Sequence, residues 1–156
     1  MQIKILNENE IREIEEIIEK NYDCKIDLKN YTVFVTRDEK IWLASKDIKN
    51  VSLSRCYRIG IYFGKIKRNK KIKLSIEGAF LIGKKAKKNI ALIDDKEAFK
   101  FLQGYDAEAE KLIGCEINNF VLVKNKNDII GVGILREKNG KIYIENLIPK
   151  ARRISF

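Results

Sequence analysis

Basic side chains are concentrated in one segment of the sequence, residues 55–88, and the chemistry that such groups perform is anion binding. The segment has twelve cations and one acid, Glu77, so its net charge is +11 in a chain whose total is +10. A positive field focused in this way favours a polyanion partner, most commonly nucleic acid. The alternative is the solvated surface of a heat-adapted protein, although such surfaces mix lysine with glutamate. The cations are Arg55, Arg58, Lys65, Lys67, Arg68, Lys70, Lys71, Lys73, Lys84, Lys85, Lys87 and Lys88.

Groups suited to catalysis or metal binding are scarce. The chain has no histidine, which is the most frequent general base and the commonest metal ligand. Its cysteines, Cys24, Cys56 and Cys115, are three in number and far apart, which argues against a disulfide framework or a metal site. We therefore expect a protein that is not an enzyme and that needs no metal or cofactor.

The composition is that of a globular protein. With 156 residues, of which 45% are hydrophobic, the chain can bury a core. No apolar run approaches the roughly 20 residues of a membrane span, and charged residues begin at Lys4, unlike a signal peptide. We expect a cytoplasmic protein without membrane contact.

The first elements should be a short strand at residues 2–6 and an amphipathic helix over residues 9–20, capped by Asn7 or Asn9. Isoleucines at helical spacing predict the helix. They are Ile11, Ile14, Ile17 and Ile18. The outer face of the helix is acidic, which disfavours a polyanion and leaves the N-terminal domain available to protein partners. Its acids are Glu13, Glu15, Glu16 and Glu19.

Two hairpins should follow. Residues 31–37 and 40–45 flank Asp38–Glu39, and residues 58–68 and 71–75 flank Asn69–Lys70. In the second hairpin, apolar residues alternate with lysines, so one face should be buried and the other cationic. The buried face would hold Ile66, Ile72 and Leu74. Phosphate contacts are expected from the other face, at Lys65, Lys67, Lys71 and Lys73.

A helix beginning after the N-cap Ser75 should extend to about Lys88. Its last two turns would then carry four lysines, where the helix dipole also favours cations. RNA contact and helix-end electrostatics both remain open for this group. Its members are Lys84, Lys85, Lys87 and Lys88.

The second half begins with a buried strand, residues 89–93, and a helix that Asp94 or Asp95 caps and Gly104 ends. The polar residues 105–114 should be a loop with an extra turn of helix. A three-strand meander follows. Its strands are expected at residues 119–125, 129–137 and 141–148. We expect two domains, residues 1–88 and 89–156, without a flexible linker.

The second half resembles a PUA domain in the order of its parts. A strand enters a helix that ends in the glycine loop Leu102–Asp106, a Val-Leu-Val strand precedes Gly131–Gly133, and the last strand runs into a basic tail. The resemblance implies an α+β protein in which an N-terminal mixed α/β domain precedes a C-terminal PUA-like β-pseudobarrel. PUA domains of this kind bind structured RNA.

Residues 59–89 look like the segment that precedes the PUA domain in two groups of proteins. These are the C-terminal region of Fmu/Sun-type rRNA cytosine-5 methyltransferases and the small two-domain archaeal and nucleolar factors of pre-rRNA processing. The resemblance implies a non-catalytic factor of ribosome biogenesis that binds rRNA or pre-rRNA and meets other assembly proteins. The alternative is an adaptor or specificity subunit of an RNA-modifying enzyme.

The resemblance also implies RNA contacts in the tail, at Lys150, Arg152 and Arg153, where a frayed basic terminus is the alternative. Gly104 should cap its helix and, secondarily, allow RNA to approach the backbone. Glu108 and Glu110 stand where related domains often have Pro-Gly, which shifts the expected contacts to the tail and the basic hairpin.

Aromatic side chains beside these sites could stack on unpaired bases, but packing within the protein is the favoured interpretation. The residues concerned are Trp42, Tyr62, Phe63 and Tyr105.

Overall fold

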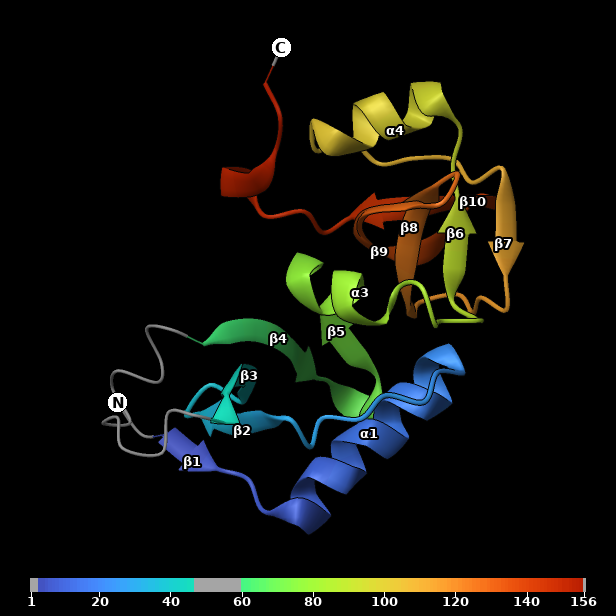
Figure 1. The fold of residues 1–156 in the computed structure, drawn as a ribbon. Helices are drawn as coiled ribbons and strands as arrows, with labels where there is room; N and C mark the ends of the chain where they lie inside the picture. The colour runs from blue at the N-terminus through green and yellow to red at the C-terminus, as the bar shows by residue number, and fades with distance from the viewer. Residues whose placement is uncertain (1–2, 47–59, 156) are drawn as a thin grey trace. The chain divides into compact units, whose positions relative to one another are not determined.

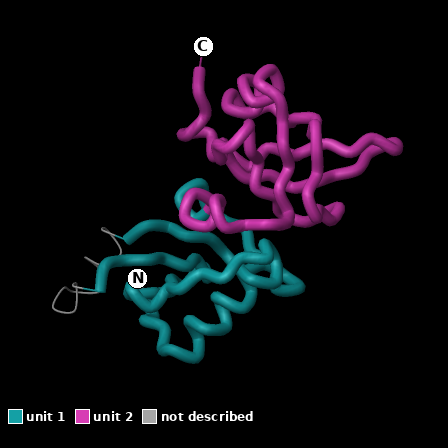
Figure 2. Tube along the Cα trace, turned by 45° about the vertical axis from the view of Figure 1, so that its right-hand side comes forward, with its two compact units in different colours: residues 1–78 teal, residues 79–156 magenta. Residues whose placement is uncertain are grey.

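The computed structural model describes residues 3–46 and 60–155. The chain forms two compact units, Met1–Gly78 and Ala79–Phe156 (Figure 2). The domain boundary expected between Lys88 and Asn89 stays a prediction. Arg55, Cys56 and Arg58 lie outside the described residues.

Unit 1 is built on a five-stranded antiparallel sheet in which the strands follow one another in chain order (Figure 1). The pairing of β2 with β3 and of β4 with β5 confirms both predicted hairpins. The short 3-10 turn η2, Arg68–Lys70, closes the second hairpin. The strands are β1 (Ile3–Ile5), β2 (Tyr31–Thr36), β3 (Lys40–Ser45), β4 (Ile61–Ile66) and β5 (Ile72–Leu74).

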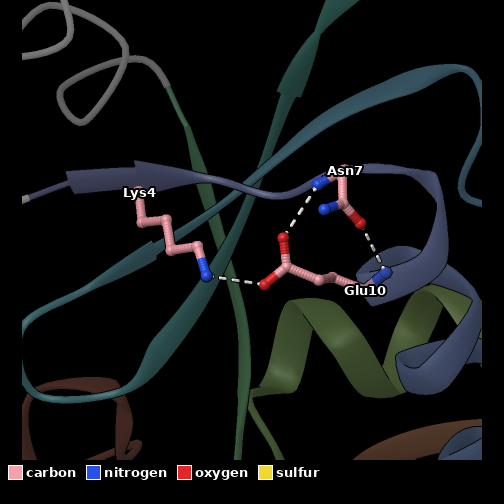
Figure 3. A network of polar contacts seen from close by, with 3 residues as sticks. All are labelled: Lys4, Asn7 and Glu10. Carbon is pink, nitrogen blue, oxygen red and sulfur yellow. Dashed lines mark hydrogen bonds and ion pairs between the residues drawn. The ribbon is translucent and has the colours of Figure 1, made fainter.

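Helix α1, Glu8–Tyr22, begins with a capping box, and of the two predicted caps, Asn7 and Asn9, it is Asn7 that caps the helix. The Asn7 side chain accepts from the Glu10 amide at 2.9 Å, and the Glu10 carboxylate accepts from the Asn7 amide at 3.1 Å. Lys4 of β1 reaches the same carboxylate at 2.7 Å (Figure 3). The lysine and the Asn7 amide lower the pKa of Glu10. The network therefore joins the start of α1 to the first strand.

The apolar side of α1 packs on one face of this sheet. Ile14, Ile18 and Tyr22 are buried, and the Tyr22 hydroxyl donates to the Ile72 carbonyl at 3.3 Å. Burial raises the pKa of Tyr22. Strand residues of alternating position complete the core, because alternate side chains of a strand share a face. They are Val33, Ile41, Leu43, Ile72 and Leu74.

Helix α3, Ile76–Ile82, is shorter than predicted. Ser75 caps it as expected, since its hydroxyl accepts from the Gly78 amide at 2.9 Å. The predicted extension to Lys88 is wrong. A Cβ at Gly83 would lie 2.5 Å from the Ile129 side chain, and the chain then turns through Asn89, whose φ is +55°, into the next strand. The four lysines therefore follow the helix instead of ending it.

Unit 2 contains a second five-stranded sheet, curled into a half-barrel, in the order β10-β9-β8-β6-β7. β6 and β8 are parallel, and the remaining neighbours are antiparallel. Strands β8, β9 and β10 confirm the predicted meander. The strands are β6 (Ile90–Leu92), β7 (Lys111–Ile113), β8 (Phe120–Asn125), β9 (Asp128–Lys138) and β10 (Lys141–Asn146).

Two details of unit 2 bear on the predictions. The expected extra turn of helix within residues 105–114 is wrong, because Lys111–Ile113 pairs with β6 as a three-residue edge strand. The glycines of β9 lie where neighbouring residues closely approach the strand backbone. A Cβ at Gly133 would come within 2.4 Å of Ile144.

Candidate nucleic-acid interface

The loop that follows helix α4, Asp95–Leu102, has a defined conformation. Asp94 caps the start of the helix by accepting from the Glu97 amide at 2.8 Å. At the other end, Gly104 has φ +106°, its amide donates to the Phe101 carbonyl, and the Tyr105 amide donates to the Lys100 carbonyl. These are the two hydrogen bonds of a Schellman motif, so Gly104 is the helix cap that the sequence predicts.

Asn146, at the end of β10, holds this loop in place. Its side-chain amide donates to the carbonyls of Phe101 at 2.7 Å and Tyr105 at 2.8 Å, while its backbone amide donates to Asp106 at 2.9 Å. Asn146 is not among the site residues that the sequence predicts. A polar amide that ends an alternating strand is its only sequence signal.

One hydrogen bond attaches the basic tail to the end of α4, and a second joins two residues of the tail segment itself. The Ile154 amide donates to the Leu102 carbonyl at 2.9 Å, and Arg153 Nε donates to the Ile148 carbonyl at 3.1 Å. The Arg153 side chain also lies on Gly104, where a Cβ would be 2.5 Å from Arg153 Cδ. A frayed terminus does not describe these residues. Arg153 fills the space that the glycine leaves, and the approach of RNA to the Gly104 backbone stays a prediction.

Other side chains of this surface point to solvent. Lys150 and Arg152, in the 3-10 turn η3 (Lys150–Arg152), are exposed, and Tyr105 is 61% exposed. The exposure of Tyr105 contradicts the prediction that this ring packs within the protein. We call residues 104–106 and 150–153 the loop–tail surface. Its exposed groups are the cations of Lys150 and Arg152 and the ring of Tyr105, and the Arg153 side chain connects the loop to the tail.

In unit 1, three lysines lie directly opposite one another on adjacent strands. Lys40 of β3 pairs with Lys65 of β4, which pairs with Lys73 of β5. Directly paired residues of antiparallel strands have their side chains on the same face, and like charges in such positions repel. We call Lys40, Lys65 and Lys73 the lysine row. The alternation predicted for this hairpin is confirmed, because Ile72 and Leu74 are buried on the opposite face.

The charge of the lysine row is only partly compensated. Burial lowers the pKa of Lys73, and the charges of Lys67, Lys65 and Lys40 lower it further. Lys40 Nζ lies 3.4 Å from a carboxylate oxygen of Asp38, whose own pKa is lowered first by the Thr36 hydroxyl.

Aromatic rings lie beside the row on the same face of the sheet. Lys40 Nζ is 5.5 Å from the centre of the Tyr62 ring. Tyr62 and Trp42 are half-buried and tilted against each other at 5.3 Å, and Trp42 stacks on Phe34 at 6.3 Å. Phe63 is fully buried, which confirms packing as its role. The row is therefore bordered by aromatic rings on the same face of the sheet.

The remaining predicted lysines are placed differently. Lys67 is exposed next to the row, and Lys71 is half-buried. After α3, Lys84, Lys85 and Lys87 are exposed in a turn of unit 2. Lys88 is half-buried and packs against Gly114. A Cβ added at Gly114 would lie 2.7 Å from the Cβ of Lys88.

Within residues 3–46 and 60–155, no cluster of three or more His, Cys, Asp or Glu side chains could hold a metal ion. Cys24 is buried. Burial raises the pKa of Cys115, whose thiol donates to the Ile90 carbonyl. No helix in this described part is long and apolar enough to cross a membrane.

Comparison with known proteins relates the chain to solved structures. No family model and no curated protein matches the sequence. The crystal structure of a PUA domain from Aeropyrum pernix K1, determined as a tartrate complex, has a TM-score of 0.57 at 10% identity, over 96% of this chain and 86% of that one. A hypothetical protein from the hyperthermophilic archaeon Pyrococcus horikoshii OT3 has a TM-score of 0.55 at 15% identity, over 94% and 93% of the two chains. The chain therefore has the predicted α+β fold with a PUA-like half-barrel sheet.

Proposed function

We propose that the protein is a non-catalytic RNA-binding factor that holds structured RNA through the loop–tail surface. PUA-like folds are generally RNA-binding, which supports the class of partner. The observation that carries the proposal is the contact between Arg153 and Gly104, which fixes a basic tail beside an exposed tyrosine. A net charge of +10 supports the same partner.

The mechanism is positioning through electrostatics. Lys150 and Arg152 neutralise phosphates, and the release of counterions from the RNA drives association. Tyr105 stacks on an unpaired base at the edge of a structured region. Arg153 is a positioning residue, because its guanidinium already donates to the Ile148 carbonyl and its side chain joins the tail to the loop by packing on Gly104.

We further propose rRNA or its precursor as the target and ribosome biogenesis as the process. Assembly proteins would meet the outer face of α1, where Glu13, Glu16 and Glu19 are exposed. Glu15 is used within the fold, since its carboxylate accepts from the Leu28 amide at 2.8 Å. The same acidic face suits the alternative, an adaptor that brings an RNA-modifying enzyme to its substrate.

The test is the affinity for a structured rRNA fragment across a salt series. The Lys150→Ala/Arg152→Ala variant should flatten the logarithmic dependence of affinity on salt by about 1.8, which is about 0.9 for each lost phosphate contact on a duplex. Lys138→Ala/Lys141→Ala is the matched control, because this exposed pair lies at the far end of β10 from Asn146. An unchanged slope in the tail variant would overturn the proposed site.

A further inference from the structure

The lysine row is an arrangement of charges that is expected to destabilise the sheet. Like charges directly opposite each other destabilise a strand pair, and here two such pairs share Lys65 as their common member. Burial of apolar side chains on the opposite face does not require lysine at any of the three positions. Positions that break a local rule without serving the fold are expected at functional sites.

A second pair of opposed lysines shows what is particular to the row. Lys138 and Lys141 also face each other, where β9 turns into β10, but both are exposed and solvent screens their repulsion. Lys73 is half-buried, and the neighbouring cations act on its charge. The lower the local dielectric constant, the stronger both the repulsion between cations and their attraction for an anion.

We propose that the lysine row is a second RNA-binding site, which takes the sugar–phosphate backbone of a single-stranded segment. Neighbouring strands lie about 4.8 Å apart, so the three ammonium groups can contact successive phosphates across the sheet. Cations next to aromatic rings are typical of single-strand sites, where backbone and bases are bound together. Tyr62 and Trp42 supply the rings, and the exposed Lys67 extends the positive field.

This inference rests on the proposed function in that RNA is the partner, but it involves none of the same residues. Unit 1 contains the row and unit 2 contains the loop–tail surface. An account with two sites predicts that single-stranded and structured RNA depend on different side chains. The two proposals can therefore fail separately.

The chain provides its own reporter for the row, because Trp42 is its single tryptophan. We would titrate the protein with a single-stranded oligouridylate and follow both the Trp42 fluorescence and the anisotropy of the labelled oligonucleotide. We expect a saturable change in fluorescence that coincides with binding. Binding seen by anisotropy without any change at Trp42 would overturn the proposal.

Lys65→Ala/Lys73→Ala should remove the fluorescence response and flatten the salt slope by about 1.4, or about 0.7 for each contact to a single strand. Lys138→Ala/Lys141→Ala removes the same charge from the other opposed pair and should change neither quantity. A response retained by the Lys65→Ala/Lys73→Ala protein would contradict the site. An equal loss of response in the Lys138→Ala/Lys141→Ala control would also contradict the site, because binding would then depend only on the total charge of the protein.

Lys65→Glu separates binding from folding. The carboxylate would face Lys40 and Lys73, so the melting temperature should not fall, while oligouridylate binding should be lost. A folded Lys65→Glu protein that binds like the wild type would overturn the proposal.

Two further arms separate the inference from the proposed function. Lys150→Ala/Arg152→Ala should weaken structured RNA binding but keep the Trp42 response to oligouridylate. If only the tail variant affects both RNAs, the inference fails and the proposed function stands. If only the Lys65→Ala/Lys73→Ala variant affects the binding of both RNAs, the proposed function of the loop–tail surface fails and the inference stands. Displacement of oligouridylate by poly-glutamate at equal charge concentration would also overturn the inference, because the site would then suit an acidic protein.

Discussion

The two cationic surfaces of this protein differ in what holds their charges in place. On the loop–tail surface, Arg153 donates to a backbone carbonyl and covers Gly104, so the cation also serves the fold. In the lysine row, each of Lys65 and Lys73 has another lysine opposite it. The first arrangement stabilises the protein and the second costs stability. Replacing the cation at Arg153 should therefore lower the stability of the fold, and replacing a cation of the lysine row should raise it, even if both substitutions weaken RNA binding.

The largest expected effect is on the support of the loop–tail surface. Asn146→Ala removes both side-chain donors to the Phe101 and Tyr105 carbonyls. Leaving such groups without partners should lower the free energy of unfolding by about 2 kcal/mol. Urea denaturation would measure it. Asn9→Ala, at an exposed position of α1, is the control and should change stability by less than about 0.5 kcal/mol. Equal effects in the two variants would mean that Asn146 does not anchor the loop.

Arg153→Ala should destabilise the protein by about 1 kcal/mol, since it removes one hydrogen bond to a backbone carbonyl and the packing on Gly104. The neighbouring exposed Lys150→Ala should leave the melting temperature nearly unchanged. If Arg153→Ala were neutral, the tail would not depend on this contact, and the first half of the comparison would fail.

Lys65→Glu should act in the other direction and raise the free energy of unfolding by about 0.5 kcal/mol, because it replaces two repulsive cross-strand pairs by attractive ones. Urea denaturation at low salt would measure the gain, which should shrink as salt screens the charges. A loss of stability in Lys65→Glu would show that the lysines do not repel one another in the folded state.

The smallest effect concerns the ionisation of Lys73. Burial and the charges of Lys67, Lys65 and Lys40 lower its pKa, so as the pH rises Lys73 should lose its proton at a lower pH than the ordinary lysine pKa implies. NMR titration of the lysine side chains would measure this. Lys67→Ala should raise the pKa of Lys73, and Lys138→Ala should leave it unchanged. Bound phosphate should also raise it, since an anion favours the charged form. An ordinary lysine pKa for Lys73 would contradict the crowding of positive charge around this residue.

Local signals in the sequence predicted much of the fold. The caps at Asn7, Asp94 and Gly104, both hairpins of unit 1 and the meander of unit 2 follow from residues within a few positions of each element. Contacts between distant residues were not predictable in this way. Helix α3 ends at Ile82, and the next residue, Gly83, lies close to Ile129, a contact that no local pattern reveals.

The same limit applies to the candidate sites. The alternation in the second hairpin predicted that Lys65 and Lys73 share a face, but Lys40 joins them only because β3 pairs with β4. That pairing connects segments separated by residues 46–60 and has no short-range signature. Similarly, Gly104 and Arg153 were predicted as separate sites, and only the folded chain brings them into contact.

The most direct test of the central claim, that this is an RNA-binding protein with two distinct contact surfaces, is a salt series of RNA affinity. It would use four proteins: wild type, Lys150→Ala/Arg152→Ala, Lys65→Ala/Lys73→Ala and Lys138→Ala/Lys141→Ala. We expect the affinity of the wild type for both RNAs to fall steeply with salt. Lys150→Ala/Arg152→Ala should flatten the slope for structured RNA, and Lys65→Ala/Lys73→Ala should flatten it for oligouridylate. Lys138→Ala/Lys141→Ala should match the wild type. Absence of binding at low salt, or four equal slopes, would contradict the central claim.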